Sequence, residues 1–499
     1  MRLNLRITWR QISSAVLSLF VFSAVWIQPT RAQSQDSRQQ EIQQLRDKLE
    51  QLDQMMKEVR EELSALEGAE QHPPGARPVA QGPVGGKEAS AQSEHVIAVP
   101  PEAVIAAPQT GVVPLEGEIT EREDSVSMYG FTMLDSGYDF GQVNPNWYDV
   151  VRPTQLPSYH NEYAPSGNVY ASVRQSRFGV KTSTPTRFGD LNTIFEFELF
   201  GTGADAGQTT FRLRHPYGEL GQFGAGQTWS PFMDIDVFPN TLEYWGPNGM
   251  VFFRNIQARW MPIRSERGSV TIALERPGAS GDQGIYADRI ELSNIQPRFN
   301  FPDLSGNGRI VRDWGYLQAA AIVRKIGWVD TSGNKTNLGG SVVGWGINLT
   351  SNLKLSKTNV AKLAFAYGHG IENYMNDAPV DVGVATNPPN SPVPLKGVAL
   401  PVLGVVSFLD HTWSERFTSS VGYSLVNIQN SDAQQPSDFH QGDYAIANLL
   451  YHPIPRVTMG SEFQFGRRAN FSDGFSSNDY RVQFSFKFDW EKSFKSPTF

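Results

Sequence analysis

A strict alternation of apolar and polar residues is the feature that most constrains how this chain can fold. From Tyr480 to Phe488 every second side chain is aromatic or aliphatic, and the residues between them are arginine, glutamine, serine and lysine. A period of two puts the apolar side chains on one face of a β-strand and the polar side chains on the other. The same alternation recurs at 191–199, 255–260 and 457–465, which predicts an all-β fold.

The first 32 residues have the pattern of a secretory signal peptide. Three arginines within the first ten residues precede an apolar run over 12–27, and Thr30 and Ala32 occupy the small-residue positions of a cleavage site. We expect the mature chain to begin at Gln33, with an uncleaved anchor as the alternative. No second long apolar run follows, so only the strands of a closed barrel could cross a membrane with every backbone polar group paired.

Cysteine content and charge exclude several classes of function. The sequence contains no cysteine, which rules out disulfides, thiolate metal sites and cysteine nucleophiles. We expect neither a metal nor any other cofactor. Six of the eight excess acidic charges precede residue 128, and no clustered basic patch typical of a nucleic-acid-binding protein is present, so no nucleic-acid partner is expected.

A heptad repeat lies within residues 33–67. From Ile42 to Leu66 the apolar residues alternate in spacings of three and four, which predicts a helical coiled coil. Two of its three flanking charge pairs would attract in a parallel assembly, and the pair Glu62 and Glu67 would repel. The pattern favours self-association, and the alternative is an amphipathic helix that lies on its own barrel.

Two further segments complete the predicted organisation. Residues 68–127 are rich in Pro, Gly, Ala, Gln and Glu and have no periodicity, which predicts a linker. The alternating pattern begins at Met128, so residues 128–499 are predicted to be a transmembrane antiparallel β-barrel. At about 10 membrane residues per strand plus connections, this length suits about 16 strands.

The connections predict a barrel with two unlike ends. Strands are predicted near 128–138, 172–183, 191–200, 209–217, 222–230 and 251–262. The links 139–171 and 231–250 are long, whereas those at 184–190 and 218–221 are short, an asymmetry typical of outer-membrane barrels. Strand boundaries between 277 and 340 are not clear from the sequence.

Two stretches of the barrel region resemble known families. Residues 176–196 resemble the early hairpin of trimeric general porins. The run FRLRHPYGELGQFGAGQTWSPFMD at 211–234, with YWGPNG at 244–249, resembles the DcaP-like porins, a family named for dicarboxylate uptake and also carrying a coiled-coil N-terminus. The resemblance implies a trimer of 16-stranded barrels that admits small, often anionic solutes by diffusion.

The sequence departs from this pattern in two respects. Outer-membrane barrels usually end on the aromatic residue that closes the last strand, whereas here Asp489–Phe499 follow Phe488. The substrate contacts of the family are not fixed by a short motif, so the identity of the solute does not carry over to this chain.

Six charged side chains are candidates for lining the narrowest part of the pore. They are Arg212, Arg214, Arg259, Asp234, Asp236 and Glu243. The arginines alternate with apolar residues, which points them into the lumen, and the acids lie in the long link that folds inward in the porins that this chain resembles. A basic wall opposite the loop acids predicts a preference for anions. Solvated loop or rim charges are the alternative for each residue.

Other arginines raise a conflict of parity. Arg174 and Arg177 have opposite parity along one predicted strand, so both cannot face the lumen. Arg254 conflicts with Arg259 in the same way.

The predicted partners follow from the porin hypothesis. We expect a homotrimer in contact with outer-membrane lipid, small anionic solutes in the pore, and a periplasmic coiled coil that could also contact the cell wall. One alternative is a structural tether of the outer membrane to the cell wall. Another is an outer-membrane hydrolase, but the eight histidines are scattered without a recognisable catalytic spacing, so we predict no catalytic residues and no enzyme activity.

Overall fold

The computed structural model describes residues 123–287, 292, 294–333 and 336–497. The predicted signal peptide at 1–32 and coiled coil at 33–67 lie outside these residues, as does most of the linker predicted at 68–127. The last five residues of that predicted linker belong to the first strand instead. Within the described part of the chain, no helix has the length and hydropathy needed to cross a membrane.

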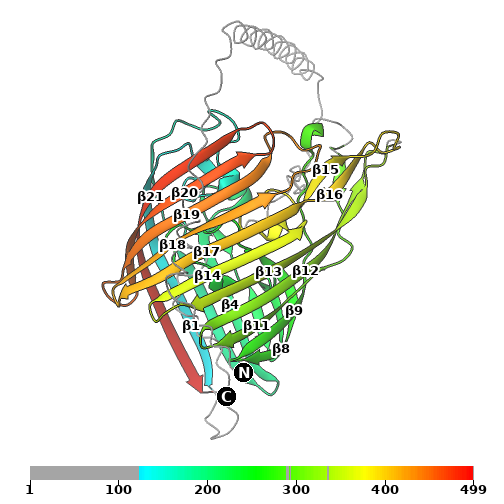
Figure 1. Cartoon of the computed structure of the whole chain (residues 1–499). Helices are drawn as coiled ribbons and strands as arrows, with labels where there is room; N and C mark the ends of the chain where they lie inside the picture. Colours follow the sequence, from blue (N-terminus) through cyan, green and yellow to red (C-terminus); the bar gives the residue numbers. More distant parts are fainter. Residues whose placement is uncertain (1–122, 288–291, 293, 334–335, 498–499) are drawn as a thin grey trace, which may run out of the picture. The chain divides into compact units, whose positions relative to one another are not determined.

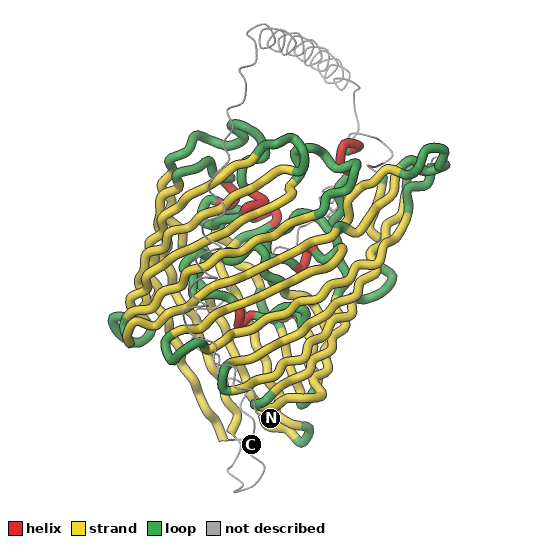
Figure 2. Tube along the Cα trace, viewed as in Figure 1, coloured by secondary structure: helices red, strands yellow, loops and turns green. Residues whose placement is uncertain are grey.

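The described residues form a closed antiparallel β-barrel (Figures 1 and 2). Its sheet contains 19 strands, and three pairs of them are single strands with an interruption: β2 with β3, β5 with β6, and β10 with β11. The wall therefore has 16 strand positions, which confirms the predicted all-β barrel. The first strand, β1 (Glu123–Asp139), closes the barrel by pairing with the last, β21 (Ser476–Pro497).

The other strands of the wall follow in chain order. They are β2 (Asn168–Ser172), β3 (Arg177–Thr186), β4 (Gly189–Phe200), β5 (Thr209–Leu213), β6 (Tyr217–Leu220), β7 (Phe223–Trp229), β8 (Arg254–Ser265), β9 (Gly268–Glu275), β10 (Ile295–Pro297), β11 (Asp303–Arg312), β12 (Gly315–Asp330), β13 (Gly340–Lys354), β14 (Asn359–His369), β17 (Pro401–Ser414), β18 (Phe417–Ile428), β19 (Phe439–Tyr451) and β20 (Val457–Asn470). Two strands outside the wall, β15 (Val382–Thr386) and β16 (Leu395–Ala399), form a separate hairpin.

The two ends of the barrel differ as predicted. One end, the short-turn rim, carries tight turns such as 187–188, 221–222 and 266–267. The other end, the long-loop rim, carries the loops 140–167 and 230–253, which correspond to the predicted long links.

Alternation along the strands separates an apolar outer face from a polar inner face. On β21 the side chains of Phe484, Phe486 and Phe488 are exposed, while Ser485 and Lys487 between them are buried. The strand does not end at Phe488. It continues to Pro497 because β1 begins at Glu123, earlier than predicted, and offers backbone partners along its whole length.

The long loops fold into the barrel and form a hydrophobic core there. Phe232 and Trp245 of the loop 230–253 are fully buried, and Tyr374 of the loop 370–400 packs against Phe232 in the same core. The core continues onto inward-facing residues of β12, β14 and β17–β19. Figure 2 shows short helical turns among the loops. The loop 230–253 contains one such turn, the 3-10 helix η4 (Ile235–Val237). Burial of these apolar side chains holds the loop in place.

Candidate functional site

The acids Asp234 and Asp236 fix the loop 230–253 to the inner wall. Asp234 is buried and accepts hydrogen bonds from Tyr316 at 2.8 Å and Thr350 at 2.5 Å. Arg309 of β11 donates to Asp234 at 2.5 Å and also pairs with Asp236, which is 51% exposed. Their nearest cation is therefore Arg309, a residue that sequence reasoning missed.

Glu243 is also bound within the folded loops. Its carboxylate accepts hydrogen bonds from the backbone N–H groups of Val151 at 3.1 Å and Trp245 at 2.8 Å, and from the Tyr444 hydroxyl at 3.0 Å. Burial, together with the nearby Glu462, raises the pKa of Glu243 to about 7, although its backbone hydrogen bonds act in the opposite direction. The side chain is enclosed by these partners, so it joins the loops 140–167 and 230–253 rather than presenting an exposed charge.

Arg212 and Arg214 lie on the inner face of β5 and just beyond its end. Arg212 lies opposite Glu198 in the pairing of β5 with β4, and its Nε donates a hydrogen bond to that carboxylate at 2.8 Å. Arg214 bridges Glu196 and Glu198, with its Nη1 at 2.5 Å from Glu198. Arg212 also donates to the hydroxyl of Tyr244 at 2.6 Å, so the loop 230–253 reaches this part of the wall.

Two more arginines join the same carboxylates. Arg177 lies 3.7 Å from Glu196 and 3.5 Å from Glu198, and Arg254 lies 3.7 Å from Glu198. We call the group the arginine cluster, with members Arg177, Arg212, Arg214, Arg254, Glu196 and Glu198. It places four guanidinium groups beside two carboxylates, an excess of two positive charges within the cluster.

The parity conflicts of the sequence disappear in the structure. Residues 173–176 leave the pleat between β2 and β3, so Arg174 and Arg177 are both buried inside, and Arg174 pairs with Asp149 at 2.6 Å. Arg254 is the first residue of β8, directly after the loop, and is buried inside although Arg259 also faces inward. The prediction that one arginine of each pair must face outward was therefore wrong.

Among the four arginines of the arginine cluster, Arg254 lies farthest from its nearest carboxylate, with one contact of 3.7 Å to Glu198. It is 9% exposed, and its Nε and Nη1 have no hydrogen-bond partner among the described residues. Its guanidinium lies 5.4 Å from the centroid of Trp229. A buried cation in this state favours the approach of an anion, because an unpaired charge in a low-dielectric interior is costly.

Arg259 stands apart from the arginine cluster. It donates to the carbonyl of Trp229 at 2.5 Å and to Gln257 at 3.0 Å, and it lies over the ring of Tyr217. Within the described residues, no ion pair joins the three predicted arginines to the three predicted loop acids. The structure brings together Arg212 with Arg214, and Asp234 with Asp236, as two separate groups.

Sequence reasoning missed the carboxylates that organise the arginine cluster. Glu196 and Glu198 alternate with Phe195 and Phe197, so their inward direction could be read from the strand pattern. Their pairing with Arg212 depends on the register between β4 and β5, which the sequence does not reveal.

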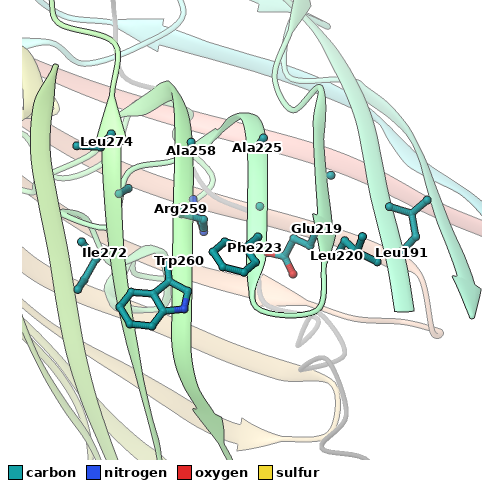
Figure 3. A pocket seen from close by; sticks show the side chains of 13 residues that line it. Leu191, Glu219, Leu220, Phe223, Ala225, Ala258, Arg259, Trp260, Ile272 and Leu274 are labelled. Carbon is teal, nitrogen blue, oxygen red and sulfur yellow. The ribbon is translucent and has the colours of Figure 1, made fainter. Parts of the chain in front are cut away.

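A separate hollow on the outer face differs in chemistry. A groove of about 550 Å³ lies over β6–β9. Figure 3 shows the side chains of Leu220, Phe223, Trp260, Ile272 and Leu274 that line it. Most of its lining is apolar and belongs to the outward-facing row of each strand. It suits hydrocarbon rather than a polar solute.

Comparisons with known proteins agree with this architecture. The model of the DcaP outer membrane protein family matches residues 109–485. The outer membrane channel DcaP of Acinetobacter baumannii is 18% identical, with a TM-score of 0.61 over 75% of this chain and 100% of that chain, and shares the fold. An anion-selective porin from Comamonas acidovorans is 10% identical, with a TM-score of 0.48 over 74% of this chain and 100% of its own. No curated protein matches this chain.

Proposed function

The chain belongs to the DcaP outer membrane protein family, and from that premise we propose that it is a porin through which small hydrophilic anions diffuse. Its barrel lies in the outer membrane, where tight turns face the periplasm and long loops face the exterior. The observation that carries the anion preference is the excess of two guanidinium groups in the arginine cluster.

Charge at a constriction decides selectivity more strongly than the net charge of the chain. A cation surrounded by low-dielectric walls raises the local concentration of anions. The loop acids do not offset the arginine cluster by direct pairing, because Asp234 and Asp236 pair with Arg309. Six of the eight excess acidic charges precede residue 128, and four of them precede the first strand of the wall.

The arrangement favours solutes that carry carboxylates. Guanidinium groups bind carboxylates through paired hydrogen bonds, and two excess cations balance two negative charges. We therefore propose dicarboxylate-like solutes as the class that this pore admits best.

Ion selectivity of the purified protein in a planar bilayer tests the proposal. Under a KCl gradient we expect a reversal potential of the anion-selective sign. The variant Arg212→Gln with Arg214→Gln leaves two arginines beside two glutamates, so its reversal potential should move toward zero or change sign. The matched control is Arg267→Gln with Arg312→Gln, two exposed arginines at the short-turn rim, which should keep the original potential. A cation-selective parent, or unchanged selectivity in the first variant, would refute the proposal.

A further inference from the structure

Two cations meet on the outer face of the barrel near the long-loop rim. They line a hollow of about 150 Å³ over the outer end of β12. We call its polar members the basic patch, and they are Arg298, Asn300, Lys325 and Ser341. Gly327 and Trp328 form part of the floor.

Lys325 belongs to the row of side chains that faces lipid. Along β12 the exposed residues include Leu317 and Val323, and Lys325 continues this row two residues further toward the long-loop rim. Its register partner on β13 is Val343, which is also exposed. The neighbouring residue Arg324 points inward and pairs with buried acids, so the two adjacent cations lie on opposite faces.

An aromatic residue indicates the depth of Lys325 in the bilayer. Trp345 is exposed on β13 and pairs in register with Val323. Exposed tryptophans mark the boundary between hydrocarbon and headgroups in membrane proteins. Lys325 lies two residues beyond this level, about 6.6 Å along the strand, and is therefore at the depth of the headgroups.

The backbone brings Arg298 to the same place. Its N–H donates to the carbonyl of Gly327 at 2.8 Å. A Cβ atom at position 327 would lie 2.6 Å from the carbonyl oxygen of Arg298, so this close approach requires glycine. This hydrogen bond and the glycine at 327 therefore keep Arg298 beside the lipid-facing side of β12.

Neither cation is neutralised by a carboxylate of the described residues. The Nζ of Lys325 lies 5.2 Å from the ring centroid of Phe301, an exposed residue that packs beside it. Asn300 and Ser341 add an amide and a hydroxyl to the lining. The combination of guanidinium, ammonium and neutral donors suits a phosphate group.

We propose that the basic patch binds the phosphate of an anionic lipid in the outer leaflet. The patch is continuous with the exposed apolar side chains of Leu304, Val323 and Val343, which would contact the acyl chains of the same molecule. This continuity favours a lipid over free phosphate, because only a lipid satisfies both surfaces. The site is separate from the pore and does not depend on the selectivity proposed above.

Native mass spectrometry of the full chain in detergent tests this site. The probes are bisphosphorylated lipid A, the same lipid after enzymatic dephosphorylation, and inorganic phosphate as a competitor. Each of Arg298→Gln and Lys325→Gln should lower the affinity for the phosphorylated lipid about fivefold, and both together about thirtyfold. Lys325→Arg should keep most of the affinity.

The matched control is Lys354→Gln with Lys357→Gln, which removes two exposed cations at the opposite end of β13 and should bind lipid as the parent does. Equal binding of phosphorylated and dephosphorylated lipid would overturn the phosphate contact. Displacement of the lipid by millimolar inorganic phosphate would assign the site to free phosphate instead. Full affinity in the double variant at 298 and 325, or loss in the control, would also overturn the proposal.

Discussion

At the scale of single residues, Arg254 and its neighbour Arg214 differ in how much folding stability the protein would lose if each were replaced. Arg214 bridges two buried glutamates at short distance, so Arg214→Gln leaves carboxylates short of a partner and should destabilise the fold by about 3 to 5 kcal/mol. Arg254 makes one long contact of 3.7 Å to Glu198 and stands beside other arginines. Its charge therefore contributes more to the electrostatic potential inside the barrel than to the stability of the barrel wall.

We therefore predict that Arg254→Gln weakens anion selectivity while the melting temperature stays near that of the parent protein. The reason is that the variant removes one of two excess cations but breaks no short ion pair. Circular dichroism on heating and the reversal potential in a KCl gradient measure the two effects separately. A loss of stability as large as that of Arg214→Gln would contradict this account.

At the scale of elements, the loop 230–253 depends on a carboxyl group that titrates near neutrality. The pKa of Glu243 is raised from 4.5 to about 7 by burial. A raised folded-state pKa means that the folded state holds the proton more tightly than the unfolded chain, so this stabilisation is complete below about 4.5 and is lost as the pH rises through about 7.

We predict that the protein melts at a higher temperature at pH 5 than at pH 8, and that Glu243→Gln reduces the difference. Glutamine resembles the protonated acid in shape and stays neutral at both pH values. Asp438 of the loop 429–438 also has a pKa of about 7, mainly because of burial, so part of the difference should remain. An unchanged pH dependence in Glu243→Gln would show that Glu243 is not responsible.

The strands could be predicted from local sequence patterns, whereas the contacts between distant elements could not. The alternation of Phe195 and Phe197 with Glu196 and Glu198 was enough to predict a strand and its two faces. The break between β5 and β6 was missed, although Pro216 lies in it and cannot donate to a ladder. The contacts of the loop acids with Arg309 join residues more than 70 positions apart, and no local pattern encodes them.

At the scale of the whole molecule, the barrel is complete from Glu123 onward. We propose that the heptads within 33–67 reinforce a parallel trimer whose main contacts are made by the barrels. Deleting residues 33–122 removes the heptads and leaves every strand of the wall. We predict a trimer that dissociates at a lower temperature than the full chain, measured by heating samples before native electrophoresis or mass spectrometry. A stable monomer would show that the barrel makes no interface of its own.

The closure between β1 and β21 has a consequence for biogenesis. Glu123 pairs in register with Pro497, so the final ladder joins segments that are synthesised at opposite ends of the barrel region. This ladder cannot form before β21 has been synthesised. Such long-range pairing is slow, because the chain loses the entropy of loop closure before the contacts form. Until then the leading strand has an open edge that could pair with another chain and aggregate. The edge of β1 that pairs with β21 is therefore open to aggregation until β21 takes its place in the barrel.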